Sequence, residues 1–208
     1  MLSLPKLYAI TDARLSGLSH AEQVARLSDG GATFVQLREK HLAPRDFYRA
    51  AERALSVARG RGVRLIINDR ADVALALGAD GVHLGQDDLP PEAARRLLGD
   101  DAIIGCSTHS VEQARRAARL PVDYVAIGPI FATSSKENPD PVIGLDGLRR
   151  VRAEVGDVVR LVAIGGITGH NIADTLRAGA DSAALIGSLV GGGSSEITAR
   201  TKALLALL

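Results

Sequence analysis

Short apolar runs alternate with longer amphipathic stretches along the whole chain. Each run has the length and β-branched character of a strand, while the stretches between runs repeat their apolar positions at helical spacing. Leu65–Ile66–Ile67 is the clearest run, and the segment that follows it, residues 70–78, has helical spacing and closes on a glycine. Strands that alternate with helices in this way form a parallel sheet.

Eight strands can be assigned in chain order, each followed by a helix. The predicted strands are residues 7–11, 33–37, 63–67, 82–84, 102–105, 122–127, 160–164 and 182–186. The predicted helices are residues 19–30, 44–60, 70–78, 91–99, 110–120, 145–155, 171–178 and 196–208. Capping-box patterns, Ser19 with Glu22 and Ser110 with Gln113, mark the start of two of these helices.

Eight βα units in one chain predict an α/β protein, most naturally a closed (β/α)₈ TIM barrel. Gly78–Ala79–Asp80 and Gly179–Ala180–Asp181, which each link a helix to a strand, support the repeat. The rival fold is an open doubly wound sheet. Its dinucleotide-binding form is disfavoured because no GxGxxG follows the first strand.

The amino-acid composition excludes several classes of protein. The 208 residues, 46% of them apolar, suffice for one core and predict a single domain over residues 1–208. Lys+Arg 25 against Asp+Glu 24 gives no basic excess for a nucleic-acid surface. A single cysteine, Cys106, excludes an internal disulfide framework, and neither a signal peptide nor a membrane-spanning apolar run is present. We expect a cytoplasmic protein without nucleic-acid or membrane partners; its oligomeric state, a homo-oligomer included, stays open.

Polar residues and glycines gather where the predicted strands end. In a barrel these ends lie on one face, which carries the active site. The residues pooled there are Gln36, Arg38, Lys40, Asn68, Asp69, Asp88, Ser107, His109, Thr133, Ser135, Lys136, Gly165, Gly166, Gly187 and Ser188. Acids that face several bases suggest a divalent metal and a phosphorylated substrate.

Asp69 and Asp88 follow two successive strands and are the candidate metal ligands. Mg²⁺ takes one or two carboxylates together with water and phosphate oxygens. An aspartate after a strand often caps the next helix instead, which is the bland alternative for each acid taken alone. Asp87 is the competing ligand, expected to point away or to cap.

Gln36, Arg38 and Lys40 occupy every second position of the segment, with Leu37 and Glu39 between them. Their side chains should therefore point to one side of the chain beyond the strand end. Gln36 offers both a donor and an acceptor, which suits a heterocycle, and the two cations suit a diphosphate. A solvated charge cluster is the commoner meaning of an Arg-Glu-Lys run.

The loop over residues 128–145 is too long for a simple turn. It carries the hydroxyls of Thr133, Ser134 and Ser135 and the ammonium of Lys136, which can hold phosphate. Long loops of this kind often act as lids, and a disordered polar loop is the alternative.

Glycines and one histidine complete the candidate site. Gly165–Gly166 and Gly187–Ser188 follow the last two strands, where barrels build phosphate sites from backbone N–H groups. His109 can serve as a general acid or base near neutral pH, or can simply begin the next helix.

Several segments, in their order and spacing, carry a resemblance to a known family. They are Tyr8–Ala9–Ile10–Thr11–Asp12, Gln36–Leu37–Arg38–Glu39–Lys40, Ile67–Asn68–Asp69, Gly81–Val82–His83–Leu84–Gly85–Gln86–Asp87–Asp88, Gly128–Pro129–Ile130–Phe131 with Thr133 to Lys136, and Ala163–Ile164–Gly165–Gly166–Ile167. On these segments the sequence resembles the thiamine-phosphate synthase family over essentially its whole length.

The resemblance implies a TIM barrel that joins a hydroxymethylpyrimidine diphosphate to a thiazole phosphate and releases diphosphate. It implies that Asp69 and Asp88 hold Mg²⁺ and that Arg38, Lys40 and Lys136 draw off the diphosphate. The implied pyrimidine diphosphate ligands are Gln36, Arg38, Lys40, Asn68, Ser107 and Lys136. The implied thiazole phosphate ligands are Thr133, Ser134, Ser135, Gly166, Ile186 and Gly187.

Two departures from the family pattern leave alternatives open. Many members have Ser where this chain has Gly187, so one phosphate-binding hydroxyl is either missing or supplied by Ser188. A sister group, the thiazole tautomerases, uses a histidine in the segment of His109 but tends to lose the acid pair. The synthase is favoured, with the tautomerase and a non-catalytic phosphate-binding barrel as alternatives.

Overall fold

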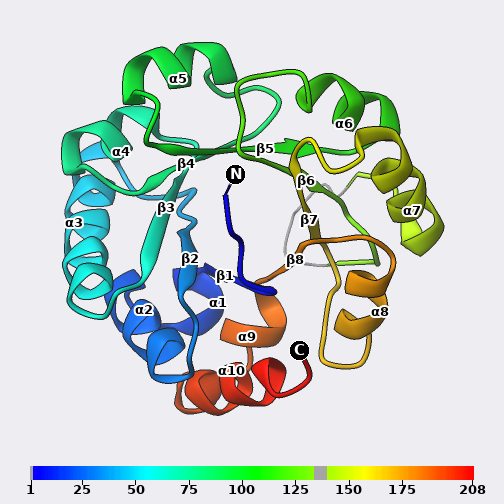
Figure 1. Cartoon of the computed structure of the whole chain (residues 1–208). Helices are drawn as coiled ribbons and strands as arrows, with labels where there is room; N and C mark the ends of the chain where they lie inside the picture. Colours follow the sequence, from blue (N-terminus) through cyan, green and yellow to red (C-terminus); the bar gives the residue numbers. More distant parts are fainter. Residues whose placement is uncertain (1, 134–139) are drawn as a thin grey trace.

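The computed structural model, which describes residues 2–133 and 140–208, is a closed barrel of eight parallel strands surrounded by helices (Figure 1). The strands are β1 Leu7–Thr11, β2 Phe34–Leu37, β3 Arg64–Asn68, β4 Gly81–Leu84, β5 Ile103–Thr108, β6 Tyr124–Ile127, β7 Arg160–Ile164 and β8 Ser182–Leu185. Each strand pairs with the next, and β8 pairs back onto β1, where Leu185 stands opposite Ala9. The expected (β/α)₈ TIM barrel is confirmed, and the open sheet is excluded.

Helices link the strands and form the outer layer (Figure 1). They are α1 Ala13–Ser16, α2 His20–Asp29, α3 Pro44–Gly60, α4 Ala71–Leu77, α5 Pro91–Leu98, α6 Val111–Ala117, α7 Gly144–Val155, α8 Ile172–Arg177, α9 Gly187–Val190 and α10 Ile197–Leu205, with a 3₁₀ turn, η1, at Ser194–Glu196. The predicted capping box of α2 is present, because Ser19 accepts from the Glu22 amide and the Glu22 side chain accepts from the Ser19 amide. Pro44 begins α3, where its missing N–H has no intrahelical acceptor to lose.

Side chains of each strand alternate between two apolar cores, because successive strand residues point to opposite faces. On β1, Leu7 and Ala9 belong to the core between sheet and helices, whereas Tyr8 and Ile10 belong to the core inside the barrel. Both faces of the sheet are therefore buried. This is why the strands read as continuous apolar runs, as at residues 65–67, instead of alternating apolar and polar residues.

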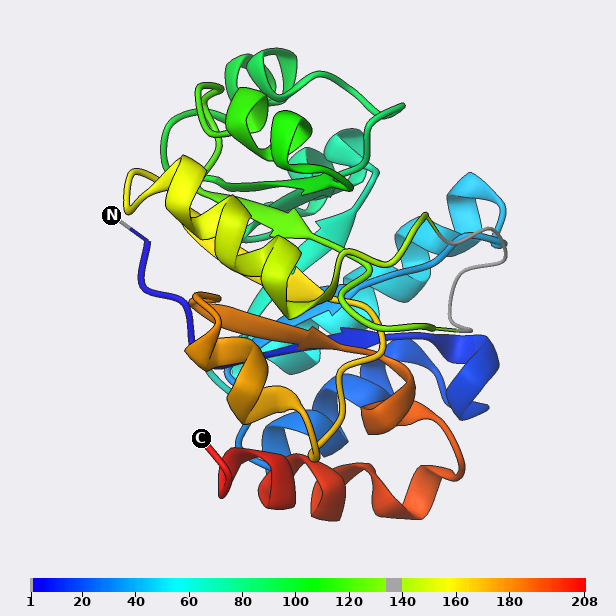
Figure 2. The same cartoon turned by 90° about the vertical axis from the view of Figure 1, so that its right-hand side faces the viewer.

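Three aspartates repeat at the amino-terminal mouth of the barrel. Asp80, Asp123 and Asp181 directly precede β4, β6 and β8, and each accepts a backbone amide from the second residue of the strand before, at 2.7–2.8 Å. The chain before β1 crosses this mouth, and Leu2 and Leu4 pack on the inner core. The strand arrows in Figure 2 point away from this end, so the strands' carboxyl ends form the opposite mouth.

The structure changes several predicted boundaries. β5 continues to Thr108, so Ser107 lies within the strand and not after it. The predicted capping box at Ser110 is half formed: Ser110 accepts from the Gln113 amide, but the Gln113 side chain accepts from the His109 amide at 2.6 Å. The apolar pattern does not predict α1 and α9, because four residues are too few to show a helical period.

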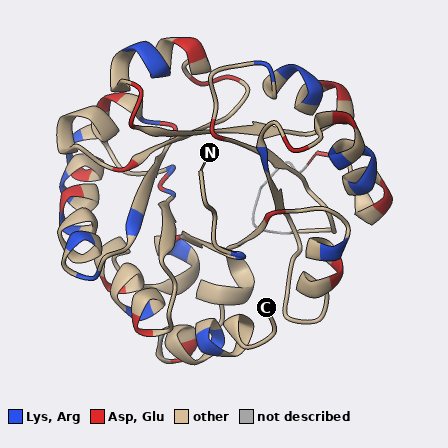
Figure 3. Ribbon diagram, in the orientation of Figure 1, with Lys and Arg blue, Asp and Glu red and all other residues tan. Residues whose placement is uncertain are grey.

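Charged side chains are spread over the outer helices. Figure 3 shows both signs interspersed around the barrel, and some pairs lie one turn apart, such as Asp174 and Arg177 at 2.5 Å. Exposed pairs of this kind contribute only a few tenths of a kcal/mol each. Within residues 2–133 and 140–208, no helix is long and apolar enough to cross a membrane.

Gly105 on β5 makes room for the ring of Tyr124, since a Cβ at position 105 would lie 2.0 Å from Tyr124 Cζ. We expect Gly105→Ala to lower the free energy of unfolding by about 1–3 kcal/mol, the usual cost of overpacking a core. Urea denaturation measures this. Gly60→Ala is the control, because nothing lies within 4 Å of a Cβ there; equal loss in both variants would contradict the packing argument.

Candidate active site

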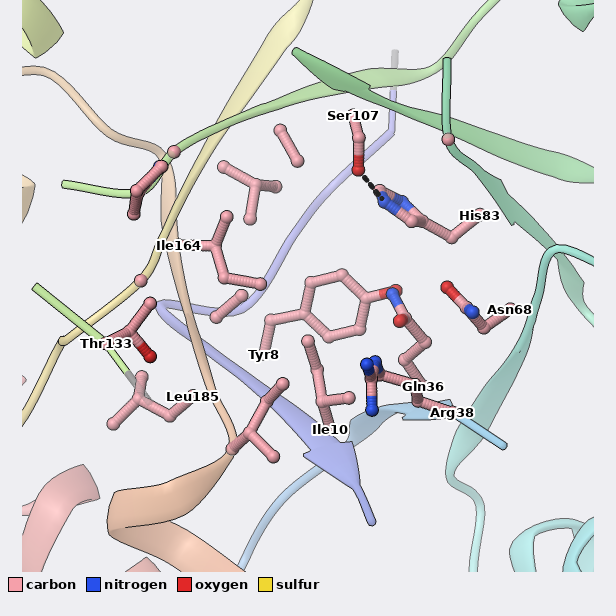
Figure 4. Close-up of a pocket in the computed structure, with 18 of the residues that line it drawn as sticks. Tyr8, Ile10, Gln36, Arg38, Asn68, His83, Ser107, Thr133, Ile164 and Leu185 are labelled. Atoms are coloured by element: carbon pink, nitrogen blue, oxygen red, sulfur yellow. Dashed lines mark hydrogen bonds between the residues drawn. The ribbon is translucent and has the colours of Figure 1, made fainter. Parts of the chain in front are cut away.

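A cavity of about 840 Å³ opens at the carboxyl ends of the strands. Part of its wall is apolar and comes from inward-facing side chains of the barrel, Ile10, Ala126, Val162, Ile164 and Ala184, together with Leu185 of the outer core. Polar side chains form another part, and Figure 4 shows Gln36, Arg38, Asn68, His83 and Ser107 among them. The volume is typical of sites that enclose small molecules.

The two predicted metal ligands, Asp69 and Asp88, lie within hydrogen-bonding reach of each other. Asp69 has a φ of 63° and is the one non-glycine residue in the left-handed region among those described. Its amide donates to the His83 carbonyl at 2.8 Å, and Asp88 Oδ2 accepts the Gly85 amide at 2.7 Å. Neither acid caps a helix, because α4 and α5 begin without a side-chain cap.

The electrostatics of this pair favour a cation. Burial raises the pKa of Asp69, contact with the Lys40 ammonium opposes that rise, and the neighbouring Asp88 adds to it. A bound cation would relieve the repulsion between two adjacent carboxylates. Two carboxylates at the mouth of a cavity fit Mg²⁺, which takes its remaining oxygens from water and phosphate. No cluster of three or more His, Cys, Asp or Glu ligands occurs in the part of the chain that the structure describes.

Arg38 points into the cavity from the end of β2 (Figure 4). One guanidinium nitrogen donates to Asp12 Oδ2 at 3.0 Å. Asp12 is itself fixed, since its Oδ1 accepts the amides of Arg14 and Leu15 and its own amide donates to Gln23 Oε1. The guanidinium is therefore oriented by one bond while its other N–H groups are left for an anion.

Glu39 lies between Arg38 and Lys40 in the sequence but turns away from the cavity. Its side chain is only 7% exposed, accepts the His41 amide at 2.7 Å and lies 3.2 Å from His20 Nε2. Arg38 and Lys40 both line the cavity. The Arg-Glu-Lys run is therefore not a solvated charge cluster, because the buried middle acid anchors the turn and directs both cations to one side.

Three neutral polar side chains line the deeper cavity. Asn68 is 6% exposed, and its Nδ2 is one of two buried side-chain atoms without a partner in the described residues. Such an unpaired donor costs about 1–3 kcal/mol, which a ligand acceptor would recover. Gln36 donates to Tyr8 Oη at 3.0 Å, and Ser107 Oγ lies 2.8 Å from His83 Nε2.

Gly165 and Gly166, at the end of β7, touch the segment that follows β6. Both have positive φ, and a Cβ on Gly166 would lie 2.5 Å from the Ala132 carbonyl oxygen. The Phe131 amide donates to the Gly165 carbonyl at 3.0 Å. The two glycines thus let this segment lie against β7, which places Thr133 at the cavity wall (Figure 4).

Ile186, Gly187 and Ser188 line the cavity after β8. Ser188 Oγ donates to the Ile167 carbonyl at 2.9 Å, so its proton is already used by the fold. In this turn, the Leu189 amide is the first that donates to the Ile186 carbonyl. The amides of Gly187 and Ser188 precede it in the first turn, where backbone donors have no intrahelical acceptor. An anion at this corner would meet backbone N–H groups in place of the missing serine hydroxyl.

His109 also lines the cavity, but its Nδ1 bonds the Gly128 carbonyl at 2.7 Å and lies 3.4 Å from Asp140. A carbonyl oxygen can only accept, so Nδ1 carries the proton in this bond. His109 thereby ties the end of β5 to the segment after β6 and keeps only Nε2 for any chemistry.

Three predicted ligands, Ser134, Ser135 and Lys136, lie outside the described residues, and their roles stay predictions. Asp87 is exposed at the edge of the cavity and remains the competing acid. The other predicted site residues, which come from the ends of seven strands, β2 to β8, line one cavity.

Comparison with known proteins decides the family. The model of the thiamine monophosphate synthase family matches residues 7–189. The chain belongs to this family. A thiamine-phosphate synthase of Chloroflexus aurantiacus is 47% identical over 204 residues, which cover 98% of this chain and 92% of that one. A thiamine-phosphate synthase of Koribacter versatilis is 49% identical over 196 residues, which cover 91% of this chain and 90% of that one.

A solved structure agrees with this assignment. Thiamine phosphate pyrophosphorylase from Pyrococcus furiosus superposes with a TM-score of 0.86 at 36% identity, over 97% of this chain and 94% of that one. The resemblance based on the sequence segments is thus confirmed. Membership in a family of synthases makes the chain a transferase, and neither alternative is favoured.

The sequence did not assign a site role to Asp12, which orients Arg38, or to His83, which lies behind Ser107. Each left a signal. Asp12 directly follows a strand, like the two acids that were selected, and His83 is a polar residue between the apolar Val82 and Leu84 of a buried strand.

Asp69→Asn is expected to stabilise the metal-free protein. The pKa of Asp69 is raised in the folded state, so folding carries its full free-energy penalty at pH values above this raised pKa. The penalty fades as the pH falls toward the ordinary aspartate pKa near 4. Asparagine removes the charge and tolerates the left-handed φ. We expect a gain in unfolding free energy of about 0.5–2 kcal/mol at pH 7 in EDTA, shrinking toward pH 4. Urea denaturation across this range measures it, and a gain that grows as the pH falls would be the wrong sign.

Proposed function

We propose that the protein joins 4-amino-2-methyl-5-hydroxymethylpyrimidine diphosphate to thiazole phosphate, giving thiamine phosphate and diphosphate. The observation that carries the proposal is the contact between Asp69 and Asp88 beside Lys40, at the mouth of a cavity with partly apolar walls. A cation-binding acid pair next to basic side chains is what a departing diphosphate requires. The proposal is supported by the family to which the chain belongs.

Departure of the diphosphate is the difficult step, and the side chains at the rim would lower its barrier electrostatically. Mg²⁺, when bound by Asp69 and Asp88, supplies Lewis-acid stabilisation of the developing negative charge. A cation at the acid pair would also release Lys40 from Asp69, so its ammonium could turn to the leaving group. Arg38, oriented by Asp12, offers its free N–H groups to the same charge. Lys136 is assigned a similar role from the sequence.

The remaining pyrimidine carries the positive charge, and the thiazole nitrogen then captures it. No protein nucleophile is needed, so positioning is the main task of the deeper cavity. Asn68 Nδ2, buried without a partner, and the Gln36 amide suit polar atoms of the pyrimidine part. The apolar wall that includes Ile10 and Ile164 limits access of water, which would otherwise trap the cation.

The phosphate of the thiazole would lie at the side of the cavity formed by the ends of β6, β7 and β8. Thr133, Gly166, Ile186 and Gly187 line this side, and Ser134 and Ser135 are assigned to it from the sequence. The close approach of Gly166 to the segment before Thr133 brings these groups together. Because Ser188 Oγ is committed to a backbone carbonyl, the part of this site after β8 would bind the phosphate through backbone amides.

A thiazole tautomerase that uses His109 is the second candidate. It is disfavoured because the acid pair is intact and because His109 Nδ1 is held by the Gly128 carbonyl. A non-catalytic barrel that binds phosphate would have no use for an acid pair beside Lys40.

The test is formation of thiamine phosphate from the two substrates, with Mg²⁺ and with EDTA. We expect metal-dependent product and at least a 100-fold loss of kcat/KM in Asp88→Asn, because one ligand and its charge are removed from the transition state. Asp87→Asn, the same change at the adjacent exposed acid, is the matched control and should stay within about twofold of wild type.

Four outcomes would count against the proposal. Product that is independent of metal, or a larger loss in Asp87→Asn than in Asp88→Asn, would overturn the metal assignment. Tautomerisation of a thiazole carboxylate phosphate without synthase activity would move the chemistry to His109. Binding of both substrates without any turnover would leave the non-catalytic barrel.

Gly187→Ser is expected to improve binding of thiazole phosphate. Gly187 has no positive φ, so its backbone conformation suits serine, whose hydroxyl would add one hydrogen bond to a charged group. We expect KM for thiazole phosphate to fall about tenfold while KM for the pyrimidine diphosphate is unchanged. If both KM values were unaffected, the phosphate would not lie at this corner.

A further inference from the structure

A chain of hydrogen bonds inside the barrel joins two neutral side chains of the cavity. Gln36 Nε2 donates to Tyr8 Oη at 3.0 Å, which lies 2.8 Å from Tyr124 Oη. Tyr124 Oη lies 2.9 Å from His83 Nδ1, and His83 Nε2 lies 2.8 Å from Ser107 Oγ (Figure 4). We call these five side chains the buried relay; only its ends, Gln36 and Ser107, have been assigned to the substrate.

The buried relay is held rigidly. Tyr8 and Tyr124 are at most 1% exposed and His83 is 7% exposed. The Tyr8 ring meets Tyr124 edge-on, with centroids 5.8 Å apart, and His83 stacks on Tyr124 at 5.6 Å. The absence of a side chain at Gly105 makes room for the Tyr124 phenol. Because the rings cannot shift easily, the direction of the hydrogen bonds is set by which group donates and which accepts.

The direction follows from the Gln36 end. An amide nitrogen only donates, so the Tyr8 oxygen accepts there and its own proton goes to Tyr124. Tyr124 then gives its proton to His83 Nδ1. Because Nδ1 accepts this proton, it carries none of its own, so the ring is neutral and its single proton is on Nε2, from which it donates to Ser107. The Ser107 proton is thereby left to point into the cavity.

The opposite direction fails at Tyr8. If Ser107 donated to His83 Nε2, then Nδ1–H would donate to Tyr124, and Tyr124 to Tyr8. The Tyr8 oxygen would accept from both Gln36 and Tyr124, and its own buried proton would find no acceptor in the relay. A buried donor without an acceptor is costly, so the first direction is favoured.

We propose that the buried relay selects the heterocycle of the substrate by fixing an acceptor at Gln36 Oε1 and a donor at the Ser107 hydroxyl. Tyr8, Tyr124 and His83 are positioning residues that act through these two ends. The ligand class is a heterocycle with an amino donor and a ring-nitrogen acceptor, that is, an aminopyrimidine. Its identity rests on the proposed function, whereas the direction of the relay does not.

Tyr124 is the link whose loss frees the Gln36 end. Without its hydroxyl, the Tyr8 proton needs a new acceptor and finds it in a reversed Gln36 amide, which then turns its NH₂ to the cavity. His83 keeps its proton on Nε2, because a proton on Nδ1 would have no acceptor, and the Ser107 oxygen can still accept from a ligand N–H. Tyr124→Phe should therefore admit a 4-oxopyrimidine, in which the donor and the acceptor are exchanged.

The first measurement is the tautomer of His83 in the full chain, by ¹⁵N NMR of labelled histidine rings at pH 7. The His83→Gln spectrum identifies its signals among the five histidines. We expect a proton on Nε2 and none on Nδ1, both in the wild type and in Tyr124→Phe. A wild-type proton on Nδ1 would overturn the proposed direction.

The second measurement compares dissociation constants of the 4-amino pyrimidine diphosphate and its 4-oxo analogue by calorimetry, with Mg²⁺ and without thiazole phosphate. We expect the wild type to prefer the amino form about 100-fold, for two mismatched hydrogen bonds, and Tyr124→Phe to reduce this preference about tenfold or more. Tyr48→Phe, the same change on α3 away from the cavity, is the matched control and should keep the preference within twofold.

The outcomes separate the relay from the proposed function. Equal preference in Tyr124→Phe and Tyr48→Phe would reduce the relay to a structural network and overturn the inference. A purely structural role would also weaken both ligands alike and leave their ratio unchanged. Wild-type protein that binds with the expected preference but makes no thiamine phosphate would contradict the proposed function and leave the relay standing.

Discussion

The contact between Asp69 and Asp88 is the constraint on which the rest of the site depends. Negative charges on the two carboxylates repel each other, a bound cation would relieve this repulsion, and the surroundings hold both acids in place: Asp69 by a left-handed backbone and Asp88 by the Gly85 amide. Lys40 supplies one positive charge, which does not balance two acids. The fold thus keeps an electrostatically strained pair at the rim, as proteins do where a cation and an anionic ligand are to bind.

Closure of the barrel brings residues that are far apart in the sequence together in one site. Side chains in a layer beneath the rim set the orientation of the residues at the rim. Asp12 orients Arg38, and the buried Glu39 anchors the turn that sends Arg38 and Lys40 to the same side. Glycines at the end of β7 allow the segment before Thr133 to approach. In the proposed mechanism, charged groups act on the ligand at the mouth, while neutral groups deeper in the barrel select the heterocycle.

The sequence predicted the barrel and most of the rim because both follow from simple rules. Strands and helices alternate visibly, and polar residues that follow buried strands, such as Asp69 directly after β3 and Asp88 in the turn after β4, lie at the carboxyl ends. The layer beneath the rim was not predicted, because it depends on partners far apart in sequence: Tyr124 on β6 reaches His83 on β4 past Gly105 of β5. The role of Asp12 was missed for the same reason. The one-turn helices α1 and α9 were missed because four residues are too few to show a helical period.

The central claim is that Asp69 and Asp88 together hold the divalent cation that diphosphate departure requires. Anomalous scattering from crystals of the full chain grown with Mn²⁺ and inorganic diphosphate tests it most directly. The account predicts one strong peak within bonding distance of a carboxylate oxygen of each acid, with Lys40 turned from Asp69 to the diphosphate. A peak on Asp87 alone, or an acid pair that binds no metal and keeps its contact with Lys40, would contradict it.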